Sequence, residues 1–234
     1  MSAFLSDSIP FPTFGTQHLL TLMAFITLVI VTMLFAPRWS EEKKKMLFIG
    51  GCWGVFGSYF TLLLLLYAVD GIQPSYNLPL YLCNITGLAL PIFAHRINQA
   101  FFEVFYFWIL GGTLQAIITP DITSGFPSFY YFKYWFLHLG LVYVILIATF
   151  VLGYRPRFRG IWLAWICLEL YFLLMMGVNY LLKSNYLYLN EKPVMPTALD
   201  FFGPWPTYVI VVQLVVIPVF ILLYLPFRNA HLRY

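Results

Sequence analysis

Residues 17–36 read QHLLTLMAFITLVIVTMLFA, twenty residues without one charged side chain. A helix needs about 20 predominantly apolar residues to cross roughly 30 Å of hydrocarbon, so this stretch predicts a membrane-spanning helix. Lipid offers the backbone no hydrogen-bonding partner, and a segment in lipid must therefore satisfy its own amides as a helix. The rest of the chain repeats runs of the same kind.

The composition excludes a soluble protein. The chain has 234 residues, of which 62% are hydrophobic and 9% charged, whereas soluble domains carry about 25% charged residues. Because so few polar side chains cannot cover a surface in water, the sequence is that of an integral membrane protein. The net charge of +4 then reports membrane topology, and no nucleic-acid partner is expected.

Seven apolar runs predict an all-α integral membrane protein, with one domain over residues 1–234 and no internal repeat. The expected helices cover residues 17–36, 46–69, 78–95, 100–118, 132–152, 161–182 and 207–227. In the second helix, Gly50, Gly54 and Ser58 recur every four residues. Small residues at this spacing predict a face that packs against another helix.

The basic residues predict the orientation. Seven helices divide the connecting segments into two sets. The first set holds Arg38, Lys43, Lys44, Lys45, Arg96, Arg155, Arg157, Arg159, Arg228 and Arg233, and the second holds only Lys133, Lys183 and Lys192. Since basic residues accumulate on the cytoplasmic side, the N-terminus is predicted outside and the C-terminus in the cytoplasm. The outer loops are longer and aromatic, which suggests that the working face lies toward the outer leaflet.

The cysteines indicate neither a disulfide framework nor a metal site. Cys52, Cys83 and Cys167 are an odd number of cysteines scattered through apolar runs, and no His/Cys cluster has metal-ligand spacing. Cys52 and Cys167 are interpreted as small hydrophobic residues. Cys83 has the same alternative, but a histidine expected at the same depth, His138, also makes it a candidate nucleophile. No metal and no cofactor are expected.

Cys83 and His138 are predicted to share one layer near the outer surface. With Asn77 as N-cap and Pro79 in the first turn, Cys83 would lie roughly 8 Å inside its helix. His138 would lie roughly 9 Å inside a helix that begins near Phe132. Polar groups are costly in lipid and tend to mark working sites. The other polar residues predicted near this layer are Asn84, Gln115, Asn179, Tyr180 and Gln213.

A thiol beside an imidazole supports acyl transfer. The imidazole takes the proton of the thiol, and the resulting thiolate attacks an ester carbonyl. Amide side chains such as Asn84, Gln115 and Asn179 are candidates to stabilise the tetrahedral oxyanion. Ester carbonyls of membrane lipids lie just below the headgroups, at the depth expected for Cys83 and His138.

Four acidic residues remain as candidates. Glu169 falls near the middle of its helix, either as a functional carboxylate or as a protonated group bonded to a neighbouring helix. Glu103 is expected to pair with Arg96 or another neighbour near the inner end. Asp121 and Asp200 lie in outer loops, where they form turns and shape an entrance.

Several ordered strings extend from residue 78 to residue 206. They are LPLYLC (78–83), YFW (106–108), GGTLQAIITPD (111–121), FLH (136–138), GYRPR (153–157), VNYL (178–181), SNY (184–186) and GPWP (203–206). In these strings the chain resembles the YwaF-type integral membrane proteins of bacteria, which share ancestry with a eukaryotic transmembrane acyltransferase. The first two helices resemble this family in hydropathy alone.

The resemblance implies a seven-helix protein of the bacterial cell membrane. From the eukaryotic branch it implies a cysteine-centred transacylase that moves a fatty acyl chain from a donor phospholipid to a lyso-ether-phospholipid. The nucleophile and the histidine of that branch fall on Cys83 and His138. The position two before the cysteine, where a polar residue is expected in the family, is Tyr81 here.

The sequence is therefore interpreted as a phospholipid acyltransferase or transacylase, with phospholipids and lysophospholipids as its partners. Cys83 would carry the acyl chain and His138 would act as general base. A lipid esterase with water as acceptor is a close variant. The alternative is a transporter or ligand-binding membrane protein that uses Glu169 and the outer polar layer, and a structural partner of another membrane complex is a third interpretation.

Overall fold

The structure is a computed structural model that describes residues 10–194 and 196–229, so that Arg233 lies outside it. The described part of the chain is helical and contains no β-strand, as the composition predicted. Its α-helices are α1 (Thr16–Phe35), α2 (Glu41–Asp70), α3 (Leu82–Arg96), α4 (Gln99–Trp108), α5 (Leu114–Ile118), α6 (Phe129–Leu146), α7 (Phe158–Leu182) and α8 (Thr207–Tyr224). A π-helical turn, Ile109–Thr113, joins α4 to α5, and another, Ile147–Val151, extends α6.

Six helical segments within the described residues are long and apolar enough to cross a bilayer, so the chain is a multi-pass membrane protein. They are Thr16–Arg38, Glu41–Asp70, Gln99–Ile118, Phe129–Val151, Phe158–Leu182 and Thr207–Phe227. The third predicted span is shorter than expected, because α3 has only 15 residues. At 1.5 Å per residue it is about 22 Å long, less than the thickness of the hydrocarbon core.

The start of α3 differs from the prediction that Asn77 caps this helix. Residues 78–81 are not helical, and Tyr81 is the N-cap. Asn77 instead closes the preceding turn, where its Oδ1 accepts a hydrogen bond from Gln73 N at 2.8 Å and its Nδ2 donates to Gly71 O at 2.9 Å. The asparagine side chain bonds the local backbone of a turn in place of a helix end.

Tyrosine hydroxyl groups from other segments satisfy the backbone that leads into α3. The Leu78 N–H donates to Tyr186 Oη at 3.0 Å, and Tyr171 Oη donates to Leu80 O at 2.7 Å. Non-helical backbone is tolerated at membrane depth only where it is buried in protein or lines a wet cavity. These two contacts therefore explain how the chain can delay the helix until Leu82.

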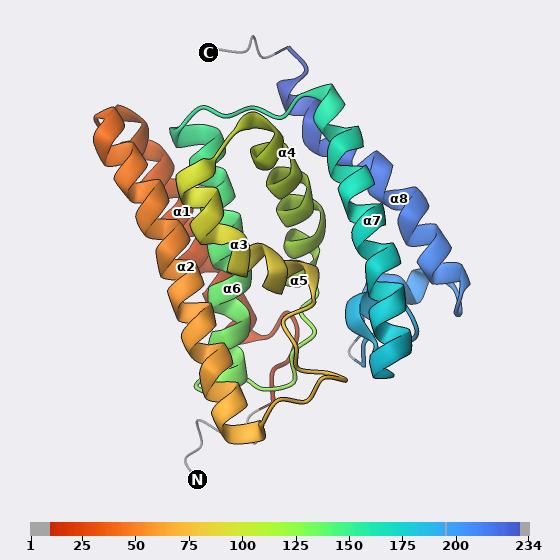
Figure 1. Ribbon diagram of the computed structural model, residues 1–234. Helices are drawn as coiled ribbons and strands as arrows, with labels where there is room; N and C mark the ends of the chain where they lie inside the picture. The colour runs from red at the N-terminus through yellow and green to blue at the C-terminus, as the bar shows by residue number, and fades with distance from the viewer. Residues whose placement is uncertain (1–9, 195, 230–234) are drawn as a thin grey trace.

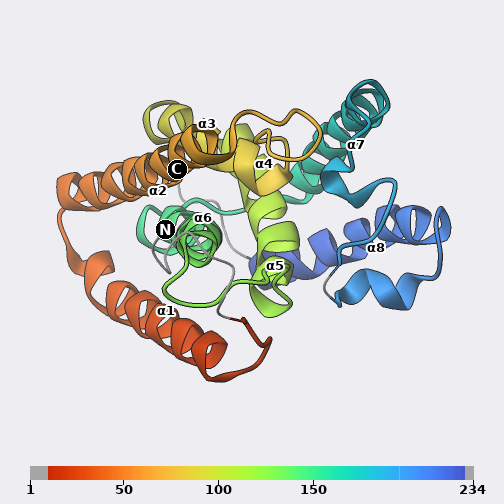
Figure 2. The ribbon, with the colours of Figure 1, turned by 90° about the horizontal axis from the view of Figure 1, so that it is seen from below.

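Helix α6 runs through the middle of the bundle. Figures 1 and 2 show α1, α2, α3 and α5 around it, with α7 and α8 on the side away from α1 and α2. In its most apolar stretch 61% of the residues are buried, compared with 11% in α1 and in α8. The interior of the protein is thus built around α6, and the outer helices present most of their surface to lipid.

Two glycines let α6 approach its neighbours closely. A Cβ atom on Gly140 of α6 would lie 2.4 Å from Cγ2 of Val55 in α2. A Cβ atom on Gly87 of α3 would lie 2.5 Å from Cδ1 of Leu137 in α6. Helices in lipid associate largely through van der Waals packing, which small residues at the contact allow. Helices α2, α3 and α6 therefore form one tightly packed unit.

The packing face predicted for α2 at Gly50, Gly54 and Ser58 is wrong. A Cβ atom on Gly50 or Gly54 would meet no atom within 4 Å, and the Ser58 hydroxyl donates to Val55 O of its own helix at 3.0 Å. Spacing alone does not determine which face of a helix is covered. The buried face of α2 carries the larger side chains of Phe48, Cys52, Val55, Tyr59, Leu63 and Leu66.

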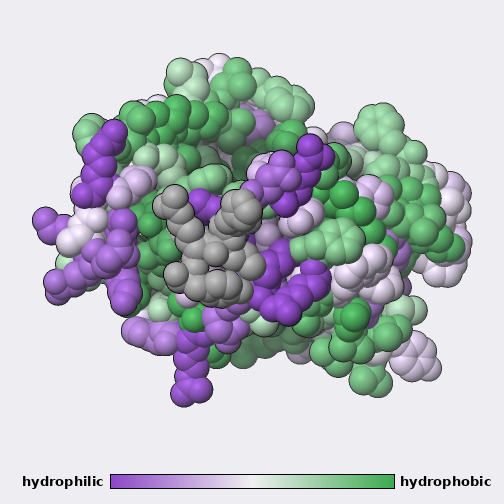
Figure 3. Space-filling model, turned by 90° about the horizontal axis from the view of Figure 1, so that it is seen from above, coloured by the Kyte–Doolittle hydropathy of each residue, from purple (hydrophilic) through white to green (hydrophobic). Residues whose placement is uncertain are grey.

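The two ends of the bundle differ in charge. One end, here called the basic end, holds the α1–α2 turn, the start of α4, the loop before α7 and the end of α8. It carries nine of the ten residues in the first basic set, from Arg38 to Arg228. Figure 3 views this end and shows hydrophilic side chains gathered on it, with hydrophobic ones around the rim. The opposite end, at which α2 ends and α3 and α6 begin, is called the cavity end after the cavity that it contains.

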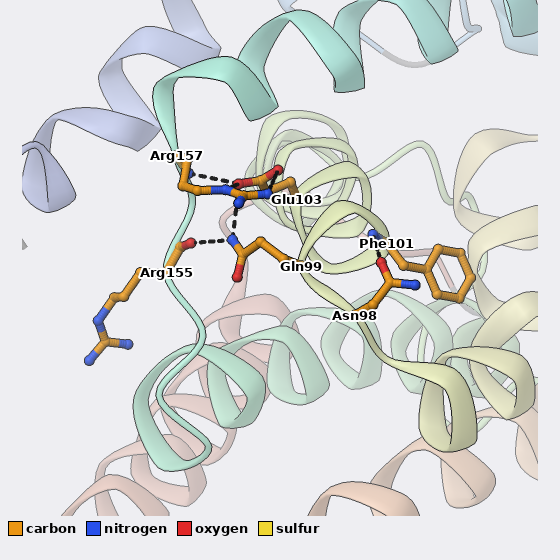
Figure 4. Close-up of polar contacts among 6 residues, drawn as sticks. All are labelled: Asn98, Gln99, Phe101, Glu103, Arg155 and Arg157. Carbon is orange, nitrogen blue, oxygen red and sulfur yellow. Dashed lines mark hydrogen bonds and ion pairs between the residues drawn. The ribbon is translucent and has the colours of Figure 1, made fainter. Parts of the chain in front are cut away.

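A buried ion pair joins α4 to the start of α7 at the basic end. Glu103 is 1% exposed, and Arg157 Nε donates to its Oε1 at 2.6 Å. Arg157 Nη2 bonds Oε2 at 3.1 Å, and Gln99 Nε2 donates to Oε1 at 2.9 Å and to Arg155 O at 2.6 Å (Figure 4). The partner of Glu103 is thus Arg157 and not Arg96. Bidentate pairing satisfies both carboxylate oxygens where water has little access.

Gly140→Ala should destabilise the protein because the new methyl group overlaps Val55. We expect a loss of about 1–3 kcal/mol in the free energy of unfolding. Thermal unfolding in detergent measures it, with Gly54→Ala as the control that meets no neighbour. Adding Val55→Ala should recover part of the loss. Equal melting temperatures for Gly140→Ala and Gly54→Ala would contradict the packing described.

Glu103→Gln should also destabilise the protein, because it leaves the guanidinium of Arg157 without a compensating carboxylate. Breaking a buried pair costs about 3–5 kcal/mol, and the low end is expected because Arg157 retains some exposure. The double change Glu103→Gln, Arg157→Gln should cost less than Glu103→Gln alone. A double-mutant cycle on the unfolding free energy would disprove the pairing if the two effects simply add.

Candidate functional site

A cavity of about 280 Å³, with both apolar and polar side chains in its wall, lies at the cavity end of the unit formed by α2, α3 and α6. Tyr59 of α2, Asn84 of α3 and Asp121 of the loop after α5 line it, with Tyr134 and His138 from α6. Two of the predicted site residues on different helices, Asn84 and His138, and the predicted entrance residue Asp121 thus meet at one cavity. Its lining offers a base, an amide, a carboxylate and phenols.

His138 is held in a defined tautomer. Its Nδ1 lies 2.7 Å from the Tyr134 carbonyl oxygen, and its ring stacks on that of Tyr134 with centroids 4.0 Å apart. Because a carbonyl oxygen only accepts hydrogen bonds, Nδ1 carries the proton. The Nε2 atom of the neutral ring then keeps its lone pair, as a general base requires. His138 is the tenth residue of α6, which begins at Phe129, three residues before the predicted start.

Cys83 is the second residue of α3, and not a turn or two inside the helix as predicted, because the helix starts only at Leu82. Its Sγ lies 3.4 Å from the Thr113 hydroxyl in the π-helical turn.

Helices α3 and α6 are in contact. The Gly87 backbone packs against Leu137, with Cys83 one turn before Gly87 and His138 directly after Leu137. The described side chains of Cys83 and His138 form no hydrogen bond with each other, because Cys83 Sγ contacts Thr113 and the His138 ring contacts Tyr134. Catalytic hydrogen bonds are often long without substrate and tighten when it binds. The helices that carry Cys83 and His138 are therefore in contact, but the two side chains are not hydrogen-bonded to each other.

Asn179 fastens the loop that follows α7. Its Oδ1 accepts from Tyr186 N and Ser184 Oγ, both at 2.8 Å, and its Nδ2 donates to Tyr186 O at 2.9 Å. The side chain is 3% exposed. The amide predicted as an oxyanion donor is therefore occupied with its own loop, and it does not line the cavity.

Tyr188 of the same loop and Tyr208 of α8 support the wall of the cavity at Asp121. Tyr188 Oη donates to Asp121 Oδ2 at 2.6 Å, and Tyr208 Oη donates to Tyr188 O at 2.6 Å. Tyr81, at the position where the family resemblance leads one to expect a polar group, packs against Tyr186 and Tyr188 with ring centroids 5.5 and 5.4 Å apart. Burial, together with Tyr81 and Asp121, raises the pKa of Tyr188, so its hydroxyl keeps the proton that it donates.

The remaining candidate residues lie away from the cavity. Tyr180 is 85% exposed on α7, Gln115 is exposed and bonds Thr119 Oγ1 at 2.9 Å, and Asp200 caps a short helical turn by accepting from Thr197 N at 2.8 Å. None of them is among the residues that line the cavity.

Two of the predicted site residues, Glu169 and Gln213, each have a buried side-chain oxygen without a hydrogen-bonding partner among the described residues. Glu169 Oε1 lies within α7, beside Trp165, and Gln213 Oε1 lies within α8. Neither residue lines the cavity. No group of three or more His, Cys, Asp or Glu residues in the described part of the chain is arranged to hold a metal ion.

Several residues of this region were missed in the sequence, among them Tyr134, which lines the cavity and stacks on His138. Tyr59 and Thr113 stand in apolar runs where nothing distinguishes them from packing residues, and Lys133 was counted only as a topology signal. The structure places Tyr59 and Lys133 on the cavity wall and Thr113 against the thiol. Their roles depend on which helices meet, which spacing along one helix does not reveal.

Comparison with known proteins identifies one family. A model of the TMEM164 family matches residues 13–224, nearly the whole chain. Searches of curated proteins and of solved structures find no match.

Asn179→Ala tests whether this residue anchors its loop. Three hydrogen bonds are lost, each worth about 0.5–1.5 kcal/mol, so amides 184–188 should exchange hydrogen faster while α6 stays protected. Hydrogen exchange read by mass spectrometry measures this, with Gln115→Ala as an exposed control. Unchanged protection of the loop would contradict the anchoring role.

Proposed function

The chain belongs to the TMEM164 family, and we propose that it is a membrane-embedded phospholipid transacylase. The contact between α3 and α6 at Gly87 and Leu137 supports this proposal most strongly, because it sets a thiol and an imidazole on touching helices. The imidazole lines the cavity, and Cys83 directly precedes the lining residue Asn84. The resemblance to YwaF-type bacterial proteins agrees with the proposal and suggests a bacterial cell membrane as the location.

In the proposed first step Cys83 takes an acyl chain from a donor phospholipid. The Sγ proton passes to His138 Nε2, and the thiolate attacks the ester carbonyl. The ester C–O bond breaks, the imidazolium protonates the departing oxygen, and a lysophospholipid leaves. The chain is then held as a thioester on Cys83. Asn84, which lines the cavity beside Cys83 in sequence, is the amide best placed for the oxyanion.

In the second step an acceptor lysophospholipid collects the chain. His138 removes the proton of the acceptor hydroxyl, whose oxygen attacks the thioester carbonyl. The C–S bond breaks and Sγ recovers its proton, so the protein ends unchanged. No cofactor is consumed, because the donor supplies the activated acyl group. A water molecule in place of the acceptor would make the protein a lipid esterase.

The proposed site faces the outer leaflet. The basic end carries nine basic residues of the first set, and such residues accumulate on the cytoplasmic side. The cavity lies at the opposite end, and we propose that this end reaches the level of the lipid ester carbonyls in the outer leaflet. Its substrates would therefore reach it from the outer half of the bilayer.

One observation favours a second candidate function. Glu169 Oε1 is buried in a membrane span without a hydrogen-bonding partner, and such carboxylates are often part of proton or ligand paths. A transporter or ligand-binding protein that uses this residue would lose function in Glu169→Gln and tolerate Cys83→Ala. The transacylase predicts the opposite pattern.

The test is acyl exchange by the purified protein between a defined phospholipid and a lysophospholipid, read by mass spectrometry. The parent and Cys167→Ala should form new diacyl product. Cys83→Ala should form none, and His138→Ala should lose at least about 100-fold in rate, the minimum typical of a missing general base. Exchange that survives in Cys83→Ala rules out the thioester, and release of free fatty acid alone indicates the esterase.

A further inference from the structure

Lys133 is the one cationic side chain among the residues that line the cavity. No carboxylate of the described residues lies within ion-pairing distance of its ammonium group. The two nearby carboxylates have other partners, because Tyr130 Oη donates to Asp70 Oδ2 at 3.3 Å and Tyr188 Oη donates to Asp121 Oδ2 at 2.6 Å. A partly buried cation that has no carboxylate in direct contact is costly and marks a place for an anion.

A second observation points to a ligand in the same cavity. Tyr59 lines it, is 1% exposed, and has a buried hydroxyl without a hydrogen-bonding partner. Buried polar groups of proteins almost always have a partner, so an exception calls for an explanation. A polar atom of a bound molecule would supply the missing bond.

The cation and the hydroxyl lie at different depths. The contact between Tyr130 and Asp70 shows that α6 begins where α2 ends. Lys133 comes four residues after Phe129, the first residue of α6, and so lies about 6 Å deeper than the start of that helix. Tyr59 comes eleven residues before Asp70, the last residue of α2, and so lies about 16 Å deeper than the end of that helix. An amphiphile entering from the cavity end would thus meet the ammonium group first and the phenol deeper.

We propose that this cavity is the headgroup subsite for the lysophospholipid, in which Lys133 binds the phosphate and the Tyr59 hydroxyl bonds a glycerol or ester oxygen. The choice of a lysophospholipid rests on the proposed function. Lysine is a common phosphate ligand because it presents a point charge with three donors. A volume of about 280 Å³ accommodates a glycerophosphate group, while the chain stays in the hydrocarbon.

The order of these contacts sets the position of the reacting oxygen. A phosphate held at Lys133 leaves the glycerol part of the lipid deeper in the cavity, where His138 is one of the lining residues. The acceptor hydroxyl then lies within reach of the base that must deprotonate it. Lys133 is therefore a specificity residue that positions the acceptor, and it takes no part in proton transfer.

Direct binding tests the subsite without relying on acyl transfer. The purified protein, in a neutral detergent, is titrated with oleoyl lysophosphatidylcholine, with monooleoylglycerol, which lacks the phosphate, and with glycerol 3-phosphate, which lacks the chain. Intrinsic fluorescence gives each Kd for the parent, Lys133→Gln, Lys133→Arg, Tyr59→Phe and the exposed control Lys183→Gln. Thermal unfolding shows that each variant is folded.

The parent and Lys183→Gln should prefer the lysophospholipid to monooleoylglycerol. Lys133→Gln should lose roughly 10- to 100-fold in affinity for the lysophospholipid only, the range expected for a bond to a charged group. Lys133→Arg should keep most of the affinity, and Tyr59→Phe should weaken both lipids. Tight binding of glycerol 3-phosphate alone would assign the site to soluble phosphates and overturn the proposal.

Equal preference of Lys133→Gln and the parent for the lysophospholipid would also overturn it. These measurements test the lysophospholipid subsite separately from the proposed transacylase activity. If lysophospholipid binding depends on Lys133 but no acyl exchange occurs, the subsite holds and the transacylase fails. If exchange occurs but Lys133→Gln leaves Kd and KM unchanged for acceptors with and without phosphate, the transacylase holds and the subsite fails.

Discussion

The close approach of α6 to α2 and α3 is the contact on which the rest of the structure depends. It is possible only because Gly140 and Gly87 leave room for Val55 and Leu137. In lipid the helices gain little from hiding apolar surface, so van der Waals contact must hold them together. The same approach closes the walls of the cavity and brings the helix of Cys83 against that of His138.

Lipid also governs how the chain can depart from helix geometry. The segment before α3 leaves its backbone groups unpaired, and hydroxyl groups of Tyr171 and Tyr186 complete them. Tyrosine suits this task because its ring is apolar while its hydroxyl reaches a distant partner. The loop that supplies Tyr186 is itself fastened by Asn179. The outer loops thus shape the mouth of α3 and, through Tyr188, the position of Asp121.

Buried polar and charged side chains have different surroundings at the two ends of the protein. At the basic end Glu103 is fully paired by Arg157 and Gln99, which makes the contact of α4 with α7 rigid. At the cavity end, Lys133 has no ion pair and the Tyr59 hydroxyl no hydrogen bond with any residue that the structure describes. Unpaired polar groups are tolerated where a ligand completes them. Chemistry is therefore expected at the cavity end and mechanical support at the other.

The sequence by itself determined the class of the protein, because the shortage of charge and the length of the apolar runs leave only membrane helices. It also selected His138 and Asn84, since polar groups at that depth are expensive wherever they point. It did not place the start of α3, which depends on distant tyrosines, nor the packing face of α2, which depends on glycines of partner helices. Only the tertiary structure brought Tyr59 and Lys133 to one cavity, because a helix sequence records the depth of each residue but not its neighbours.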